Sequence, residues 1–197
     1  MKKKDIKILI VGHGRHGKDT LANMLDVELG FKFRGSSEVA ASAVVYPLMS
    51  NFYDSPEDAF SRRHENRELW RAVISDFNRE DPARLSKLVC ADGHGYTGLR
   101  DKREVITTIK SGLFTHVIWI KRPDLKEDDS TMMFDLSDLE TLNRNGFCRQ
   151  LAYVENHTEE VLLDVVQNEL KDFLFRYNPN KTEYIGITRD KLLTDKS

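Results

Sequence analysis

A glycine-rich loop between a strand-like run and a helix-like run constrains this chain more than any other feature. Residues 6–11, IKILIV, are apolar and rich in β-branched side chains, as in a strand that is buried on both faces of a parallel sheet. The stretch GHGRHGKDT, residues 12–20, follows directly, and LANMLDVEL then predicts a helix that ends at Gly30. A strand, a glycine-rich turn and a helix in this order predict the first crossover of an α/β sheet.

The loop fits the spacing G-x-x-x-x-G-K, with Gly12, Gly17 and Lys18 at its fixed positions. Glycines permit positive φ, so successive N–H groups can turn inward around phosphate oxygens, and the helix start adds positive potential. We expect Lys18 to reach the β and γ phosphates of a nucleotide. The alternative is a glycine-rich turn with a solvated lysine, which the strand and helix on either side disfavour. The predicted ATP- and phosphate-binding residues are Gly12, His13, Gly14, Arg15, His16, Gly17, Lys18, Asp19, Thr20 and Arg122.

Asp19 stands where this motif normally has a serine or threonine whose hydroxyl binds Mg²⁺. A carboxylate also binds Mg²⁺, directly or through water, because hard cations prefer oxygen ligands. Thr20 is the next residue and offers a hydroxyl, so Asp19 and Thr20 both stay open as the metal ligand. His13 and His16 have no spacing typical of a zinc site. They are placed to touch the nucleotide, and the alternative, more common for loop histidines, is that they face solvent.

A second group of cationic residues belongs to a helix predicted from about residue 56 to residue 77. Its apolar stripe, at the spacing i, i+3, i+4 and i+7, consists of Trp70, Val73, Ile74 and Phe77. Arg67, Arg71 and Asn78 form a ridge beside this stripe, and Arg63 lies close to it. Such arginines either extend over apolar surface towards water or point into a cleft and bind phosphate. Because the same chain carries a phosphate loop, we expect at least Arg67 to bind an anion.

Two further arginines follow predicted strands. Arg100 comes after GYTGL and Arg122 after HVIWIK, and the carboxyl ends of parallel strands line the ligand crevice of such sheets. Glu104 lies one helical turn after Arg100 and is placed to orient it, although an ordinary surface pair is the alternative. Both arginines are therefore predicted to meet phosphate groups.

The remaining chain continues the alternation of strands and helices. We predict strands at FKFR, GYTGLR, HVIWIK and, as the last, CRQLAYVEN. We predict helices at SSEVAASAVVYPLM, ARLSKLV, DKREVITTIKSG and TEEVLLDVVQNELKDFLF. This pattern predicts an α/β fold with three layers, a parallel sheet with helices on both faces, in one domain over residues 1–197. The polar segment 122–146 is expected to be a lid or a surface excursion, and the segment 178–197 a peripheral tail.

The composition of the chain gives only weak guidance on its partners and its compartment. The chain has 40% hydrophobic and 31% charged residues and a net charge of −2, so it shows no basic excess that would favour nucleic acid or membrane surfaces. Cys90 and Cys148 lie far apart and outside any metal-ligand spacing, which suits a reducing cytoplasm. The apolar run after the first lysines is too short for a signal peptide. We therefore expect a cytoplasmic protein, in the host cytoplasm if a phage encodes it.

The order of the segments resembles the phage-type P-loop deoxynucleoside monophosphate kinases and their nucleotide-kinase relatives. The matching segments are GHGRHGKDT, FKFRGSSE with VVYPL, YDSPEDAFSRRHENRELW with DFN, GLRDKRE, HVIWIKRP and ENHTEEVLLDVV. This resemblance implies a P-loop kinase fold with ATP on the loop and a substrate monophosphate under the second helical region. It also implies that Arg63, Arg67 and Arg100 contact the substrate or the transferring phosphate. Two departures are a short middle insert and Arg62 in place of an aspartate.

Three functions compete at this point. The first is transfer of a phosphoryl group from Mg-ATP to a (deoxy)nucleoside monophosphate, with Lys18, Arg67 and Arg100 as catalytic residues. The second moves the acceptor to a hydroxymethyl pyrimidine base in phage DNA, with Asp76 or Asp92 as general base. The third is a nucleotide-binding regulatory module without transfer, which the many arginines disfavour. The predicted substrate-binding residues are Ser37, Arg63, Arg67, Arg71, Asn78 and Arg100. A homodimer stays open, because the sequence is silent on oligomeric state.

Overall fold

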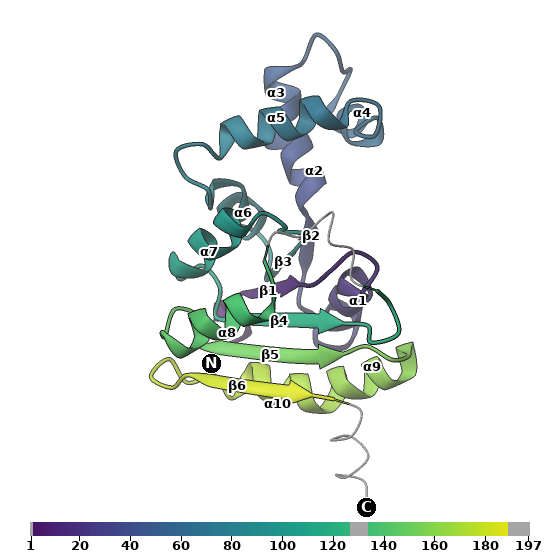
Figure 1. Ribbon diagram of the computed structural model, residues 1–197. Helices are drawn as coiled ribbons and strands as arrows, with labels where there is room; N and C mark the ends of the chain where they lie inside the picture. The colour runs from purple at the N-terminus through teal and green to yellow at the C-terminus, as the bar shows by residue number, and fades with distance from the viewer. Residues whose placement is uncertain (1, 127–133, 189–197) are drawn as a thin grey trace, which may run out of the picture.

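The computed structural model describes residues 2–126 and 134–188. Within them, six strands form one sheet in the order β2-β3-β1-β4-β5-β6, and every neighbouring pair is parallel (Figure 1). The strands are β1 (Ile8–Val11), β2 (Phe33–Gly35), β3 (Gly95–Thr97), β4 (His116–Lys121), β5 (Gln150–Glu155) and β6 (Glu183–Ile187). The predicted parallel α/β sheet is confirmed.

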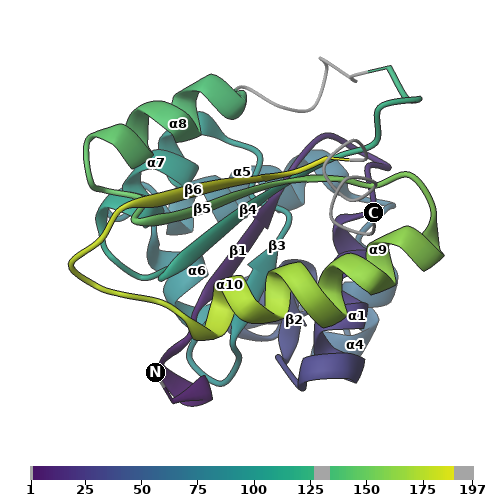
Figure 2. The same ribbon diagram turned by 90° about the horizontal axis from the view of Figure 1, so that it is seen from below.

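Helices cover both faces of this sheet (Figure 2). Ile8 and Ile10 of β1 pack towards one helical layer, and Leu9 and Val11 pack towards the other, because successive side chains of a strand point to opposite faces. The first layer consists of α1 (Lys18–Leu29), α9 (Glu159–Val165), the π-helical turn η3 (Val166–Leu170) and α10 (Lys171–Phe175). The second layer includes α6 (Arg84–Val89), α7 (Lys102–Lys110) and α8 (Leu136–Arg144). Both faces of the sheet are therefore buried, as the apolar strands predicted.

A lobe of short helices projects beyond the β2 side of the sheet (Figure 1). This helical lobe, residues 36–77, contains α2 (Ser36–Ala40), the π-helical turn η2 (Ala41–Val45), α3 (Tyr46–Leu48), α4 (Pro56–Ser61) and α5 (Arg67–Phe77). The predicted helix after FKFR begins at Ser36, but no side chain caps it, and Gly35 is its N-cap residue.

The helix predicted over residues 56–77 is two helices. Ser55 caps α4 by accepting a hydrogen bond from the N–H of Asp58, but α4 ends at Ser61 and α5 begins at Arg67. Trp70 of α5 is buried and donates its indole N–H to the hydroxyl of Tyr53 at 3.3 Å. Residues 62–66 contain no proline or glycine, so local sequence does not mark the break, and the apolar stripe of α5 packs on the core.

Part of the segment predicted as a lid is a packed helix. Asp135 and Asp138 form a capping box that starts α8, and Leu139 and Leu142 are buried in the core beside the sheet. Residues 136–144 are thus part of the second helical layer, and the prediction of a lid or surface excursion was wrong for them. The acidic residues 127–130 lie outside the described residues.

The prediction that β5 is the last strand was also wrong. Residues 183–187, inside the segment expected to be peripheral, pair in parallel with β5 and form the edge strand β6. Ile187 is buried, and Glu183 donates its backbone N–H to the carbonyl oxygen of Arg149. In the described residues no helix has both the length and the apolar character needed to cross a membrane.

Candidate active site

Three loops meet at the carboxyl edge of the sheet. The chain leaves β1 towards α1 on one face, whereas it leaves β3 towards α7 and β4 towards α8 on the opposite face. Neighbouring strands whose connections diverge in this way open a crevice at their carboxyl ends, which is where α/β sheets bind ligands. The glycine-rich loop, Arg100 and Arg122 all follow these strands, so the sequence prediction that they share one edge agrees with the topology.

The loop after β1 has a backbone that requires glycine at two positions. Gly12 has a φ of 148° and Gly17 a φ of 97°, and between them Arg15 has a φ of 66°. A Cβ atom on Gly12 would collide with the carbonyl oxygen of Ile120, and one on Gly17 would collide with the side-chain amide of Asn156. These two glycines therefore let β4 and β5 approach the loop closely.

Asn156, directly after β5, is a loop-holding residue for which the sequence predicted no role. Its side-chain Nδ2 donates a hydrogen bond to the carbonyl oxygen of His16 at 3.1 Å, and its backbone N–H donates to the carbonyl oxygen of Lys121 at 2.8 Å. It joins β4, β5 and the loop at one point. Its position at a strand end, before a capped helix, was the available signal.

The two loop histidines are buried, so the alternative that they face solvent was wrong. His16 accepts the backbone N–H of Arg122 on Nδ1 at 3.0 Å, which requires that nitrogen to be unprotonated. His13 packs edge-on against Trp119, with ring centroids 5.7 Å apart. Both imidazole rings are thus held against the end of β4. The backbone N–H groups of the loop are therefore the groups that can bind phosphate.

Lys18 opens α1 and folds back over the loop. Its Nζ donates to the carbonyl oxygens of Gly12 at 2.7 Å and His13 at 2.6 Å. Burial, and then the nearby positive charge of Arg100, lower the pKa of Lys18 to about 8, against a smaller opposing effect of Asp19. Arg100 is therefore close enough to the loop lysine for the two cations to influence each other.

Asp19 connects the start of α1 to the end of β3. Its exposed carboxylate accepts a hydrogen bond from the hydroxyl of Thr97 at 3.3 Å, and Thr20 beside it is half-buried. No group of three or more His, Cys, Asp or Glu side chains suited to a metal occurs among the described residues. An ion at Asp19 would therefore need oxygen ligands from phosphate and water, which is the usual situation of Mg²⁺.

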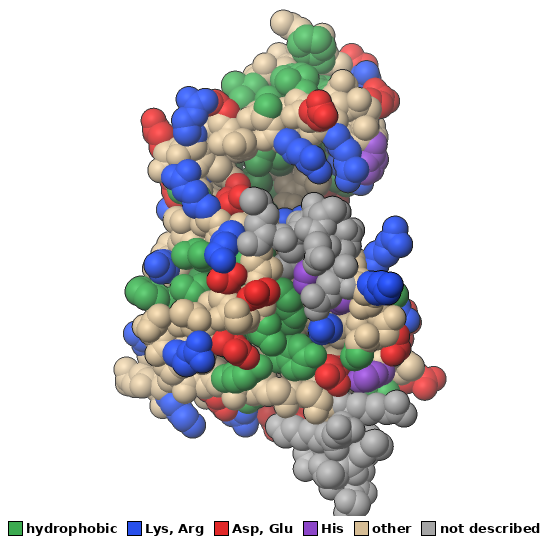
Figure 3. Space-filling model, in the orientation of Figure 1, with side chains coloured by type: hydrophobic (Ala, Val, Ile, Leu, Met, Phe, Trp, Pro, Cys, Tyr) green, Lys and Arg blue, Asp and Glu red, His purple; other side chains and the backbone are tan. Residues whose placement is uncertain are grey.

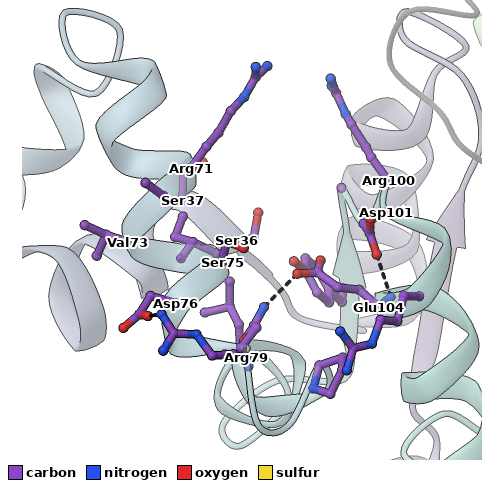
Figure 4. Close-up of a pocket in the computed structure, with 18 of the residues that line it drawn as sticks. Ser36, Ser37, Arg71, Val73, Ser75, Asp76, Arg79, Arg100, Asp101 and Glu104 are labelled. Carbon is purple, nitrogen blue, oxygen red and sulfur yellow. Dashed lines mark hydrogen bonds and ion pairs between the residues drawn. The ribbon is translucent and has the colours of Figure 1, made fainter.

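A cleft with a volume of about 1160 Å³ lies between the helical lobe and the β3–α7 connection, and Arg100 connects it to the loop through its effect on Lys18. Figure 3 shows Lys and Arg side chains on both parts of the molecule around the constriction where they meet. Arg71 of α5 and Arg100 extend from opposite walls towards the same side of the cleft (Figure 4). Of the predicted substrate-binding residues, the cleft is lined by Ser37, Arg71, Asn78 and Arg100.

Arg63 and Arg67 do not line this cleft. Arg63 stacks over the ring of Phe60, 4.2 Å from its centroid, and donates to the carbonyl oxygen of the same residue at 2.8 Å. Arg67 is exposed at the first residue of α5. On the predicted ridge, only the arginine one turn further along, Arg71, reaches the cleft.

A polar pair joins the two walls of the cleft, and Figure 4 marks its hydrogen bond by the dashed line at Glu104. Asn78, which is buried, donates Nδ2 to Oε1 of Glu104 at 2.8 Å and accepts the backbone N–H of Leu85 at 3.1 Å. The sequence predicted that Glu104 would orient Arg100, but its carboxyl group pairs with Asn78 instead. Burial raises the pKa of Glu104, and the hydrogen bond from Asn78 opposes that shift.

The two candidate general bases differ in position. Asp76 lines the cleft and pairs with Arg79, which also lines it. Asp92 pairs with Arg34 at 3.2 Å, is 82% exposed and lies outside the cleft lining. Cys90 and Cys148 are buried free thiols, and burial raises their pKa to about 11 and about 12.

Comparison with models of known protein families gives no match for this chain, and comparison with curated proteins gives none either.

Proposed function

We propose that this chain is a P-loop nucleotide kinase that transfers a phosphoryl group from ATP to a (deoxy)nucleoside monophosphate. The single observation that carries the proposal is the position of Arg100, which influences the charge of Lys18 in the loop and also lines the cleft. A binder of one nucleotide needs the loop alone. A transferase needs two anion sites next to each other, because the reacting phosphate oxygens must meet in line.

The loop residues fit the triphosphate of ATP. Gly12 and Gly17 keep side chains out of the loop, and α1 begins without a capping side chain, so the N–H groups of its first turn are free of a cap. Such N–H groups and the positive helix end bind phosphate. Lys18 would exchange the carbonyl oxygens of its own loop for phosphate oxygens, and a phosphate would favour its charged form.

Asp19 and Thr20 fit Mg²⁺ as partners that supply one or two oxygen ligands beside the phosphates. When bound, Mg²⁺ would neutralise charge on the triphosphate. The hydrogen bond from Thr97 holds the Asp19 carboxylate at the carboxyl end of β3, the strand that Arg100 follows.

The cleft fits the acceptor monophosphate. Arg71 and Arg100 present planar guanidinium groups from opposite walls, and such groups bind phosphate through paired hydrogen bonds. Apolar residues of the lining, among them Val73, Ile74 and Leu85, can cover the faces of a base. No covalent intermediate is needed, because Lys18 and the arginines would hold both phosphates and stabilise the charge that spreads during transfer.

The proposal is tested by incubating the protein with Mg-ATP and each common deoxynucleoside and ribonucleoside monophosphate, and by measuring nucleoside diphosphate and ADP in equal amounts. Diphosphate formation from at least one acceptor is the expected result. Hydroxymethylated DNA is a further acceptor in the same screen, since Asp76 lies in the cleft wall. ATP binding without transfer to any acceptor would overturn the proposal and leave the regulatory module.

A further inference from the structure

The cleft has two arginines on one side and a carboxyl group on the other. Arg71 and Arg100 extend towards one side, and Glu104 lies on the other side together with Arg79, whose charge is paired with Asp76 (Figure 4). A nucleotide has the same polarity, with an anionic phosphate at one end and a neutral base at the other. With the phosphate at the two arginines, the base is the part of the nucleotide that reaches Glu104.

Glu104 is a hydrogen-bond acceptor with capacity to spare. An ionised carboxylate accepts on both oxygens, at about four lone-pair positions. Among the described residues, Asn78 is the side chain that donates to this carboxyl group, and it reaches Oε1. The backbone N–H of Glu104 donates to the side chain of Asp101, which caps α7. The Glu104 carboxyl group is therefore not needed as a cap for this helix.

Asn78 cannot turn away to serve as an alternative reader of the base. Its Oδ1 accepts the backbone N–H of Leu85 and its Nδ2 donates to Glu104, so both ends of the amide are fixed. The pair Asn78–Glu104 therefore presents the remaining lone pairs of the carboxyl group to the cleft. Burial raises the pKa of Glu104, and the selectivity requires the ionised carboxylate, because the neutral acid would also offer an O–H donor.

We propose that Glu104 reads the exocyclic amino group of the acceptor base, so that nucleotides with an amino-bearing base are preferred over those with a carbonyl group at the same ring position. An amino group on the base donates a hydrogen bond to the carboxylate oxygen of Glu104. A carbonyl oxygen at the same ring position has no proton to donate, and its lone pairs would repel those of the carboxylate. A site built on such a hydrogen bond discriminates strongly, since the wrong base leaves a buried group unpaired. This inference rests on the proposed kinase function and adds the class of base.

The matched substrates are dCMP and dUMP, whose bases differ at C4 in carrying an amino or a carbonyl group. For the unaltered protein we expect kcat/KM for dCMP to exceed that for dUMP by tenfold or more. In Glu104→Gln, the amide keeps an oxygen for Asn78 and gains an N–H group for the C4 carbonyl. The dCMP-to-dUMP ratio should therefore fall at least tenfold. Glu57→Gln, which removes an exposed carboxylate outside the cleft, should leave the ratio unchanged.

Binding of dCMP and dUMP without ATP, measured by calorimetry, separates this inference from the kinase function. Tighter binding of dCMP that depends on Glu104 supports the inference even where no transfer occurs, and absence of transfer by itself counts against the kinase function only. Transfer to both nucleotides with equal efficiency, or a ratio that Glu104→Gln does not move, overturns the role of Glu104. Failure of both nucleotides to bind overturns it as well.

Discussion

The side-chain amide of Asn156 donates a hydrogen bond to the carbonyl oxygen of His16, and it occupies the space that a Cβ atom on the next residue, Gly17, would need. The end of β5 thus fixes the shape of a loop that lies 140 residues earlier in the chain. The contact lies at the turn where Gly17 adopts a positive φ and α1 begins with Lys18.

Gly17→Ala should destabilise the protein by about 1–3 kcal/mol, because alanine at a φ of 97° is strained and its Cβ collides with Asn156. It should also weaken ATP binding, because the loop must move away from Asn156 to make room for the added methyl group. Chemical denaturation and nucleotide titration measure the two effects. Gly14→Ala is the matched control for stability, because a Cβ atom there meets nothing within 4 Å. Equal stability of the two variants would contradict the role given to Asn156.

Lys18→Ala should lower kcat by about 100-fold or more, because one preorganised cation at the transferring phosphate typically contributes about 3 kcal/mol. The fold should survive, since within the described residues the Lys18 side chain donates to carbonyl oxygens of its own loop and ties no other element to it. Steady-state kinetics and thermal unfolding provide the two readouts. Lys171→Ala, an exposed lysine of α10, is the control. An unchanged kcat in Lys18→Ala would contradict the role assigned to the loop in phosphoryl transfer.

The pKa of Lys18, about 8, predicts a pH dependence near neutrality. The lysine loses its charge as pH rises through about 8, so kcat/KM for ATP, which reports the free enzyme, should fall above that pH. Arg100→Gln removes one cause of the lowered pKa of Lys18. The pH at which kcat/KM for ATP begins to fall should therefore be higher in this variant, even where the substitution also lowers kcat/KM at every pH. Arg103→Gln, in the same cleft wall, should leave the limb in place. A limb at the same pH in Arg100→Gln and the unaltered protein would refute the coupling.

Arg71→Ala should raise KM for the acceptor monophosphate at least tenfold and leave KM for ATP nearly unchanged, because Arg71 lines the cleft and belongs to α5 rather than to the loop. Initial rates with each substrate varied in turn distinguish the two constants. Arg144→Ala, an exposed arginine at the end of α8 and outside the cleft lining, serves as control. If KM for ATP rose instead, the assignment of acceptor and donor sites would be reversed.

Much of the fold could be predicted because its signals are local. The apolar run before Gly12 and the C-cap Gly30 each act within a few residues, and each is found as predicted. The same local rule holds for the helix caps Ser55 and Thr158. β6 and α8 escaped prediction because their stability comes from partners rather than from pattern. The strand pairs with β5 at a sheet edge, and the helix buries Leu139 in the core.

The predicted site divides along the same line. Arg67 and Arg71 lie one turn apart on one face of α5 and cannot be told apart by helical periodicity, yet only Arg71 lines the cleft. His13 and His16 are buried because Trp119 and the backbone of Arg122 come to them from β4.

The sequence by itself determined the parallel α/β architecture and the glycine-rich loop, because hydrophobic period and glycine's backbone freedom are properties of short segments. Only the tertiary structure decided which side chains share the cleft. Asn78 and Glu104 are 26 residues apart, and Lys18 and Arg100 belong to different strand ends. Their proximity follows from the strand order, which places β3 beside β1, and from the packing of α5 on the core. Neither is a property of any segment alone.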